Sequence, residues 1–425
     1  MYLGLVSQLS AEVAALETLF VHLARHSWIS VLAEPRFSEK VRHAERASRD
    51  IDTAYRLADF LSRTVQRRSG PVFWSPVLCP SRSEFSDAGI LQPAIEKNSD
   101  RIKLEIHKRA SRLLDQLSAI AALRPWHSLI SNCLSESRIG DVPSDLQTLD
   151  FEEVTRSSSI PVVTKSLTGP RSVRLDSRFM GSYSILATMS PDFSDRLENA
   201  VPYFWTLSIR EAMACDSCAL SGVEYDGMPL AFYLDIAKQV WDEARHAEMF
   251  LQLSSDLMPE LLSTEGINPR LRIVMNSFIE RGVPLPIPIE GNMYEAMWSA
   301  DLTARLILMQ IQTEGAAVGR IRKRLNSPLA LAFGNVRVAF ELDLRDEISH
   351  TMLGRRWLRY LHPASAERKA AIETAGAIRN LVIASALAAR SGQSVSAAMQ
   401  AAYAGKRVEF SNPWAAPDEG SGHWQ

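Results

Sequence analysis

The sequence predicts an all-α protein in which a four-helix bundle follows a separate N-terminal helical domain. Apolar residues recur at three- and four-residue steps over four long segments, at about 203–222, 229–257, 293–324 and 328–362. This is the period of an amphipathic helix. One long connection, GINPRLRIVMNSFIERGVPLPIPIEGN, separates the second segment from the third. Two helical hairpins joined by a crossover are therefore expected.

The composition is typical of a globular chain that does not bind nucleic acid. Its 425 residues allow two or three domains, with 46% hydrophobic and 23% charged residues. The 47 basic and 49 acidic residues leave no basic excess for a phosphate backbone. Four cysteines favour a reducing compartment. No apolar run approaches the ~18 residues of a membrane-spanning helix, so a cytoplasmic protein without a membrane segment is expected.

The chain is expected to divide into four parts. Residues 1–133 form the N-terminal helical domain, with 18 basic and 14 acidic residues and a Pro/Ser/Gly-rich break at 69–93 that a regular helix should not tolerate. Residues 134–200 are rich in Ser, Thr, Pro and Gly and are expected to be an irregular linker or lid. The bundle occupies 201–362. Residues 363–425 contain an Ala-rich helix at about 365–390 and a tail of disordered type.

Two copies of an Asp-Glu-x-x-His motif carry the chemistry. They read DEARH at 242–246 and DEISH at 346–350. Glu and His three residues apart share one face of a helix, so each pair can hold a metal ion. Each motif follows a helix with one matching glutamate, Glu211 or Glu314. The spacings within the two halves are 32 and 33 residues, and the halves are offset by 103 or 104.

The apolar stripes place these acids inside the bundle, where an unpaired carboxylate is costly. Two divalent ions would neutralise four carboxylates and two neutral imidazoles, and this donor set suits iron, with manganese as the alternative. The six predicted ligands are Glu211, Glu243, His246, Glu314, Glu347 and His350. Asp216 is a weaker choice for the first ligand, because it lies 27 residues before Glu243 and breaks the match between the halves.

Three aspartates are expected to support the ligands. Asp242 and Asp346 immediately precede the motif glutamates and are expected to accept hydrogen bonds from ligand histidines across the two halves. Asp343 lies one turn before Glu347, as an additional carboxylate or as a capped or water-bound acid at the bundle edge. Helical spacing also places Cys215, Cys218, Gln310 and Ala317 within a turn or two of the ligands, as candidate walls of a substrate pocket. The alternative for both cysteines is plain core packing.

Residues 203–362 resemble the ferritin-like di-iron carboxylate superfamily in the order Glu211, Glu243/His246, Glu314, Glu347/His350. The runs FYLDIAKQVWDEARHAEMF and DEISHTMLGRRWLRYL are similar to a bacterial ferritin-like family of unassigned function with DEARH and DEIGH-type motifs. The serine in DEISH departs from that pattern outside the ligands. Members of the superfamily include ferroxidases, monooxygenases, desaturases, N-oxygenases, a tRNA hydroxylase and manganese catalases.

The function expected from this pattern is a di-iron oxygenase or oxidase that uses O2 on a small organic substrate. Ferroxidase action, tRNA hydroxylation and manganese catalase action are the alternatives. Flavin and nicotinamide fingerprints are absent from the sequence. An external electron donor is therefore expected where the reaction needs one. Self-association into a homodimer is left open.

Overall fold

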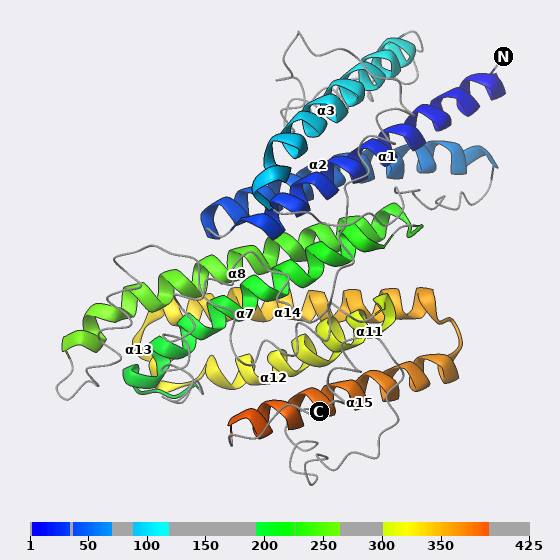
Figure 1. Ribbon diagram of the computed structural model, residues 1–425. Helices are drawn as coiled ribbons and strands as arrows, with labels where there is room; N and C mark the ends of the chain where they lie inside the picture. Colours follow the sequence, from blue (N-terminus) through cyan, green and yellow to red (C-terminus); the bar gives the residue numbers. More distant parts are fainter. Residues whose placement is uncertain are drawn as a thin grey trace. The chain divides into compact units, whose positions relative to one another are not determined.

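The protein is all-helical throughout the part that a computed structural model describes, namely residues 2–34, 37–69, 88–118, 193–225, 227–263 and 301–390 (Figure 1). This confirms the all-α prediction for those residues. None of their helices is long and apolar enough to cross a membrane. Most of the predicted linker or lid, the long crossover and the C-terminal tail lie outside the described residues.

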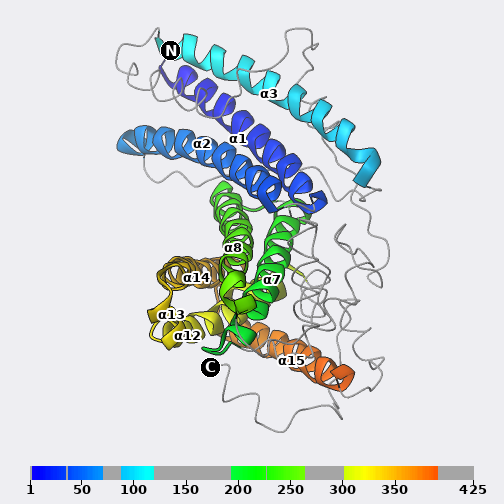
Figure 2. The ribbon, with the colours of Figure 1, turned by 90° about the vertical axis from the view of Figure 1, so that its left-hand side faces the viewer.

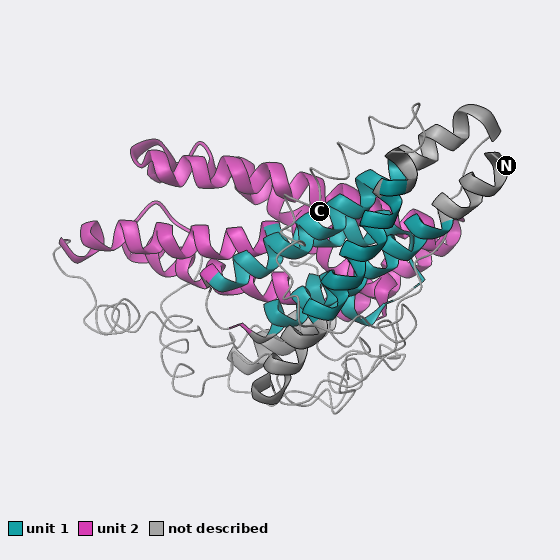
Figure 3. Ribbon diagram, turned by 90° about the horizontal axis from the view of Figure 1, so that it is seen from above, with its two compact units in different colours: residues 1–33, 39–165, 218–241 teal, residues 34–38, 166–217, 242–425 magenta. Residues whose placement is uncertain are grey.

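Two compact units divide the chain, and helices α7 (Leu197–Glu224) and α8 (Leu230–Ser263) each contribute to both (Figure 3). The first unit comprises residues 1–33, 39–165 and 218–241, and the second comprises 34–38, 166–217 and 242–425. Because α7 begins at Leu197, its first turn falls within the predicted segment 134–200.

The first unit contains α1 (Tyr2–Ala33), α2 (Phe37–Ser69) and α3 (Ala88–Ser118), and α1 packs against α3 (Figure 2). Their apolar faces form its core. Arg109 of α3 joins the two helices, since it donates to Glu105 at 2.8 Å and to Glu12 of α1 at 3.2 Å.

Helix α1 also closes the end of α7 within this unit. Arg25 donates to the carbonyl oxygens of Gly222 at 3.3 Å and Tyr225 at 3.1 Å, which satisfies acceptors that a helix end leaves without partners. Trp28 lies directly over Gly222, where an added Cβ would be 2.4 Å from the indole ring. A glycine is therefore required at this contact.

The predicted break at 69–93 is too long at its C-terminal end, because α3 already begins at Ala88 and includes Pro93. Pro93 is the sixth residue of α3, so its missing N–H costs the helix one hydrogen bond but does not end it. The break therefore ends before residue 88.

The second unit contains the remaining helices: the α7 and α8 segments, α11 (Leu302–Leu306), η3 (Ile307–Thr313), α12 (Glu314–Arg324), α13 (Pro328–Ala332), α14 (Gly334–Leu361) and α15 (Ser365–Arg390). The predicted helix at 328–362 is in fact two, because Phe333 is extended, at φ −118° and ψ 104°. The predicted helix at 365–390 is confirmed.

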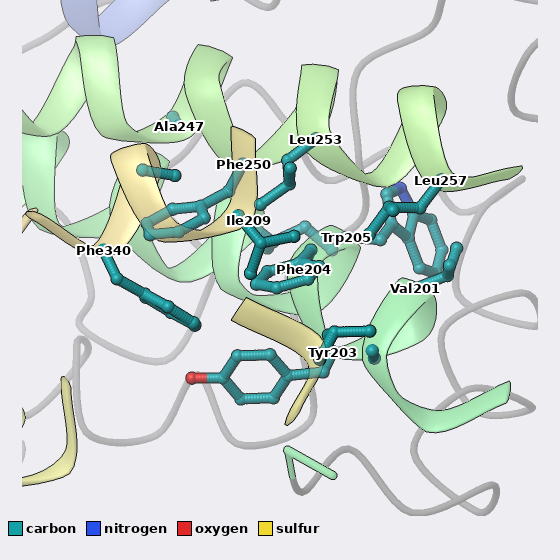
Figure 4. Close-up of a cluster of buried hydrophobic side chains, with 14 of the residues drawn as sticks. Val201, Tyr203, Phe204, Trp205, Ile209, Ala247, Phe250, Leu253, Leu257 and Phe340 are labelled. Atoms are coloured by element: carbon teal, nitrogen blue, oxygen red, sulfur yellow. The ribbon is translucent and has the colours of Figure 1, made fainter. Parts of the chain in front are cut away.

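One apolar layer joins four helices of this unit (Figure 4). Phe204 of α7 stacks on Phe250 of α8, with ring centroids 6.1 Å apart, and lies 5.8 Å from Phe340 of α14. Ile321 of α12 belongs to the same cluster. Each of the four stands seven residues from a predicted ligand glutamate, which is about 10 Å along a helix. The apolar layer therefore sets the height of the carboxylate layer.

The predicted helix at 293–324 has an unexpected π-helical segment, η3, immediately before Glu314. The backbone N–H of Glu314 donates to Met309 O and the Thr313 hydroxyl donates to Leu308 O at 2.7 Å, each five residues back. A π turn shifts the face on which later side chains lie, and such turns are frequent at functional sites. Residues 293–300 lie outside the described chain.

Gly354 permits close contact between α14 and η3. An added Cβ would lie 2.5 Å from Gln310 Cβ, 3.1 Å from Ile311 Cγ1 and 3.3 Å from Leu306 O. These atoms are close to or part of the η3 backbone, so they cannot move aside cheaply.

We expect Gly354→Ala to lower the free energy of unfolding by about 1–3 kcal/mol, because the methyl group overpacks this contact. Gly319→Ala is the matched control, since nothing lies within 4 Å of its added Cβ and alanine is the better helix former by about 0.5–1 kcal/mol. Urea unfolding followed by circular dichroism measures both. Equal stability of the two variants would contradict the close contact.

Candidate metal centre

The six predicted ligands lie together in the second unit, on four helical segments. Glu211 comes from α7, Glu243 and His246 from α8, Glu314 from the first residue of α12, and Glu347 and His350 from α14. Glu211 is partly buried and the other five are buried. The Glu and His of each pair on α8 and α14 are three residues apart, so they share one face of the helix. That face is buried.

Their donor atoms form two overlapping groups. The first is Glu211, Glu243, His246 and Glu347, and the second is Glu243, Glu314, Glu347 and His350. Within each group the atoms lie no more than 4.8 Å from one another. Asp216 is buried but belongs to neither group. The structure thus brings Glu211, rather than Asp216, to the cluster.

Glu243 and Glu347 belong to both groups, and each directs one oxygen toward each histidine. Glu243 Oε2 is 3.4 Å from His246 Nδ1, and its Oε1 is 3.3 Å from His350 Nδ1. Glu347 Oε1 and Oε2 lie 4.0 Å and 3.9 Å from the same two nitrogens. A nitrogen and an oxygen that each bind one ion at about 2.0–2.2 Å are about 3 Å or more apart. Both glutamates therefore supply oxygens to both donor groups and would be within reach of each bound ion.

The far side of each imidazole ring is held by an aspartate of the opposite half. His246 Nε2 is 3.2 Å from Asp346 Oδ2, and His350 Nε2 is 3.2 Å from Asp242 Oδ2. This is the crossed pairing predicted from the sequence. An Nε2–H that donates to a carboxylate leaves the Nδ1 lone pair directed at the glutamates.

The inner atoms fit a bound cation. Both Nδ1 atoms, Glu314 Oε1 and Glu347 Oε2 are buried and make no hydrogen bond with the described residues. Buried polar atoms are otherwise almost always paired. Oxygen and imidazole donors without a thiolate suit iron or manganese better than structural zinc.

Arg245, which was not among the predicted site residues, ties the two aspartates together. Its Nη2 donates to Asp242 Oδ1 at 2.5 Å and to Asp346 Oδ2 at 3.2 Å. The second motif has Ser349 at the corresponding position, so one arginine serves both halves. The only signal in the sequence was the difference between DEARH and DEISH.

Burial and mutual repulsion oppose ionisation of the cluster. Burial, together with the neighbouring carboxylates, raises the pKa of Glu211 and Glu347 well above the usual value. Burial likewise raises the pKa of Glu314 to about 7 and that of Asp343 to about 6. Without a cation, the cluster therefore retains protons that metal binding would displace.

The pKa values of His246 and Asp346 are governed by hydrogen bonds and neighbouring charges more than by burial. Burial would lower the pKa of His246, but its hydrogen bond with Asp346 and the nearby carboxylates of Glu243 and Asp343 raise it well above the usual value. Burial would raise the pKa of Asp346, but its hydrogen bond with His246 and the charges of His246 and Arg245 lower it to about 2. Asp346 thus stays ionised and holds the imidazole. Asp343 is buried, with Oδ1 3.8 Å from His246 Nδ1.

The four predicted pocket residues are also buried or partly buried. Cys215 and Cys218 are buried and form no disulfide, Gln310 is buried in η3, and Ala317 packs against the apolar layer. Their contribution to a substrate pocket stays a prediction.

Comparison of the chain with protein-family models, curated protein sequences and solved structures found no match.

We expect the metal-free protein to lose stability relative to its Glu314→Gln variant as pH rises from 5 to 8. The difference between their free energies of unfolding should change by an amount on the order of 1–3 kcal/mol. The folded pKa of Glu314 is about 7 and its usual value is 4.5. Between these values the folded chain binds more protons than the unfolded chain, so stability falls with rising pH. Asp346 acts oppositely, but only between about 2 and 3.8.

Urea unfolding of chelator-treated protein at several pH values measures this difference. The control is Glu341→Gln on α14, an exposed acid paired with Arg337 at 2.9 Å. The difference in free energy of unfolding between Glu341→Gln and the parent should not change with pH. A parent that gains stability over Glu314→Gln as pH rises would contradict the assignment of the raised pKa.

Proposed function

We propose that residues 201–362 form a ferritin-like four-helix bundle that holds two iron ions and uses O2 to oxidise a small organic substrate. The single observation that carries this proposal is the pair of overlapping donor groups that share Glu243 and Glu347. Two divalent ions would balance the charge of the four ligand glutamates in a buried site. Glu211 and His246 would then hold mainly one ion, and Glu314 and His350 mainly the other.

The chain's own residues would fix the site in several ways. Asp346 and Asp242 hold the Nε2–H of each histidine and so aim Nδ1 inward. Arg245 keeps both aspartates in place. The apolar layer around Phe204, Phe250 and Phe340 closes one end of the site to water. When bound, reduced iron would supply the electrons that activate O2.

The size of the chain favours substrate oxidation over iron storage. More than half of the 425 residues lie outside the bundle, whereas mineralising iron requires little beyond the ligands. Confining an activated oxygen species beside one substrate does require additional protein. The first 133 residues, with 18 basic and 14 acidic side chains, offer little support for tRNA as the substrate.

We expect Asp242→Asn and Asp346→Asn each to weaken ferrous iron binding about 10–100-fold, because an amide holds the ligand histidine less firmly than a carboxylate does. Glu341→Gln is the control on the same helix as Asp346, since Glu341 is half-exposed and pairs with Arg337 at the surface. Anaerobic competition with a coloured chelator measures the affinity. Equal affinities in all three variants would mean that the aspartates do not tune the histidines.

The proposed function is tested by metal analysis of protein from iron-supplemented culture, followed by anaerobic reduction and rapid mixing with O2. We expect about two iron ions per chain, fewer in Glu243→Ala and Glu347→Ala, and O2 consumption that depends on a substrate. Enlarging Ala317 to Leu should slow substrate oxidation more than iron oxidation, because the added volume would occupy the predicted substrate pocket.

Other outcomes would overturn the proposal. Full metal loading of both glutamate variants would remove the ligand assignment. Oxidation of many ferrous ions per chain with growth of a ferric mineral would identify a ferroxidase. Rapid disproportionation of hydrogen peroxide by a manganese-loaded form would identify a catalase.

A further inference from the structure

The outer face of α14 carries both exposed apolar residues and a strong excess of positive charge. Five apolar side chains are exposed there: Val338 at 53%, Leu342 at 37%, Ile348 at 37%, Met352 at 66% and Tyr360 at 50%. The exposed charged residues of the helix are five arginines, at 337, 345, 355, 356 and 359, and one glutamate, Glu341. The whole chain, by contrast, has a net charge of −2.

The exposed and half-exposed residues follow the helical period. Positions 338, 342, 345, 349, 352 and 356 are three or four residues apart, so they form one stripe along the side of α14 opposite to Glu347. The other side is buried against its neighbours. We call residues 338, 342, 345, 349, 352 and 356 the α14 stripe.

The α14 stripe mixes apolar residues (Val338, Leu342 and Met352) with two arginines (Arg345 and Arg356), and this mixture indicates the kind of partner. A membrane-binding helix has a continuous apolar face with basic residues at its flanks, whereas Arg345 and Arg356 lie in line with Val338, Leu342 and Met352. A second copy of the same face would carry the same excess of five exposed arginines over one exposed glutamate, so it would not be complementary in charge. A helix with apolar residues at the same spacing and acidic residues between them is complementary in both shape and charge.

The stripe lies behind two predicted metal ligands. Glu347 and His350 project from the buried side of the same helix, so about one helix diameter, about 10 Å, separates the stripe from the cluster. An electron-transfer protein docked here would be near the site without entering it.

We propose that the α14 stripe, with its flanking arginines, is the docking surface for an acidic electron-transfer protein. The electron-transfer role rests on the proposed di-iron function. The binding of the partner rests on the α14 stripe alone. The redox step would pass one electron from the reduced partner to ferric iron held by the six ligands, with no atom transferred. Docking through charge implies binding that weakens as salt is raised.

The probe is an acidic 2Fe–2S ferredoxin, and its binding to the full chain is measured by calorimetry, with and without iron, at low and high salt. We expect Arg356→Glu/Arg359→Glu to weaken binding about tenfold or more, because like charges then face each other. Val338→Ser/Met352→Ser should weaken binding about threefold or more through lost apolar burial. The matched control is Arg322→Glu/Lys323→Glu, an equal charge reversal in the last turn of α12, which should leave binding within about twofold of the parent.

Reduction of chain-bound ferric iron by the reduced ferredoxin provides a second measurement, and its rate should fall in the same two α14 variants. Equal weakening by the α12 control would overturn the docking surface. So would binding of anionic phosphatidylserine vesicles without ferredoxin binding, or a dimer dissociated by Val338→Ser/Met352→Ser. Ferredoxin binding without iron reduction would overturn the electron-transfer role. A chain that binds no iron would refute the proposed function. Ferredoxin binding to the iron-free protein, measured in the parent and the α14 variants, would still test the docking surface.

Discussion

Repulsion among buried carboxylates is the constraint on which the rest of the second unit depends. Glu211, Glu243, Glu314 and Glu347 lie in one layer, and each additional negative charge makes the others harder to ionise. Their burial is tolerable only where protons or cations compensate them. Helices that meet at such a layer need strong packing elsewhere. The aromatic contacts of Phe204 with Phe250 and Phe340 supply it, two helical turns away.

The repeat within the chain explains why the site is nearly symmetric. Each half contributes one lone glutamate and one Glu/His pair, and each histidine is held by the aspartate of the other half. Neither half could form the site alone, because the orientation of its histidine depends on its counterpart. The symmetry is broken at Arg245 and Ser349, and at the π turn that precedes Glu314 but has no equivalent before Glu211 in the described part of α7.

Helix α14 combines several requirements in 28 residues. Its inner face supplies Asp343, Asp346, Glu347 and His350, and Gly354 lets η3 approach closely. Its outer face retains apolar and arginine side chains that the fold itself does not bury. Stability alone would favour polar residues at Val338 and Met352. Their exposure is the observation that motivates the proposed docking surface.

The sequence by itself determined the helical class, the approximate bounds of α7, α8 and α15, and the six residues that converge. This was possible because a three-residue Glu/His spacing and an apolar period of 3.6 are local properties of a helix. The crossed pairing of His246 with Asp346 also followed from the duplicated motif.

Only the tertiary structure decided which glutamates face both histidines and how the halves are joined. Glu243 and Glu347 occupy the shared positions because of the way four helices meet, and spacing along one helix carries no such information. Arg245 reaches Asp346 across 101 residues of sequence, an interaction that no local pattern indicates. The π turn at 307–313 and helix α13, which ends at the break at Phe333, both pack against α14. Local propensity yields to such packing when burial of the side chains stabilises the chain by more than the altered backbone costs.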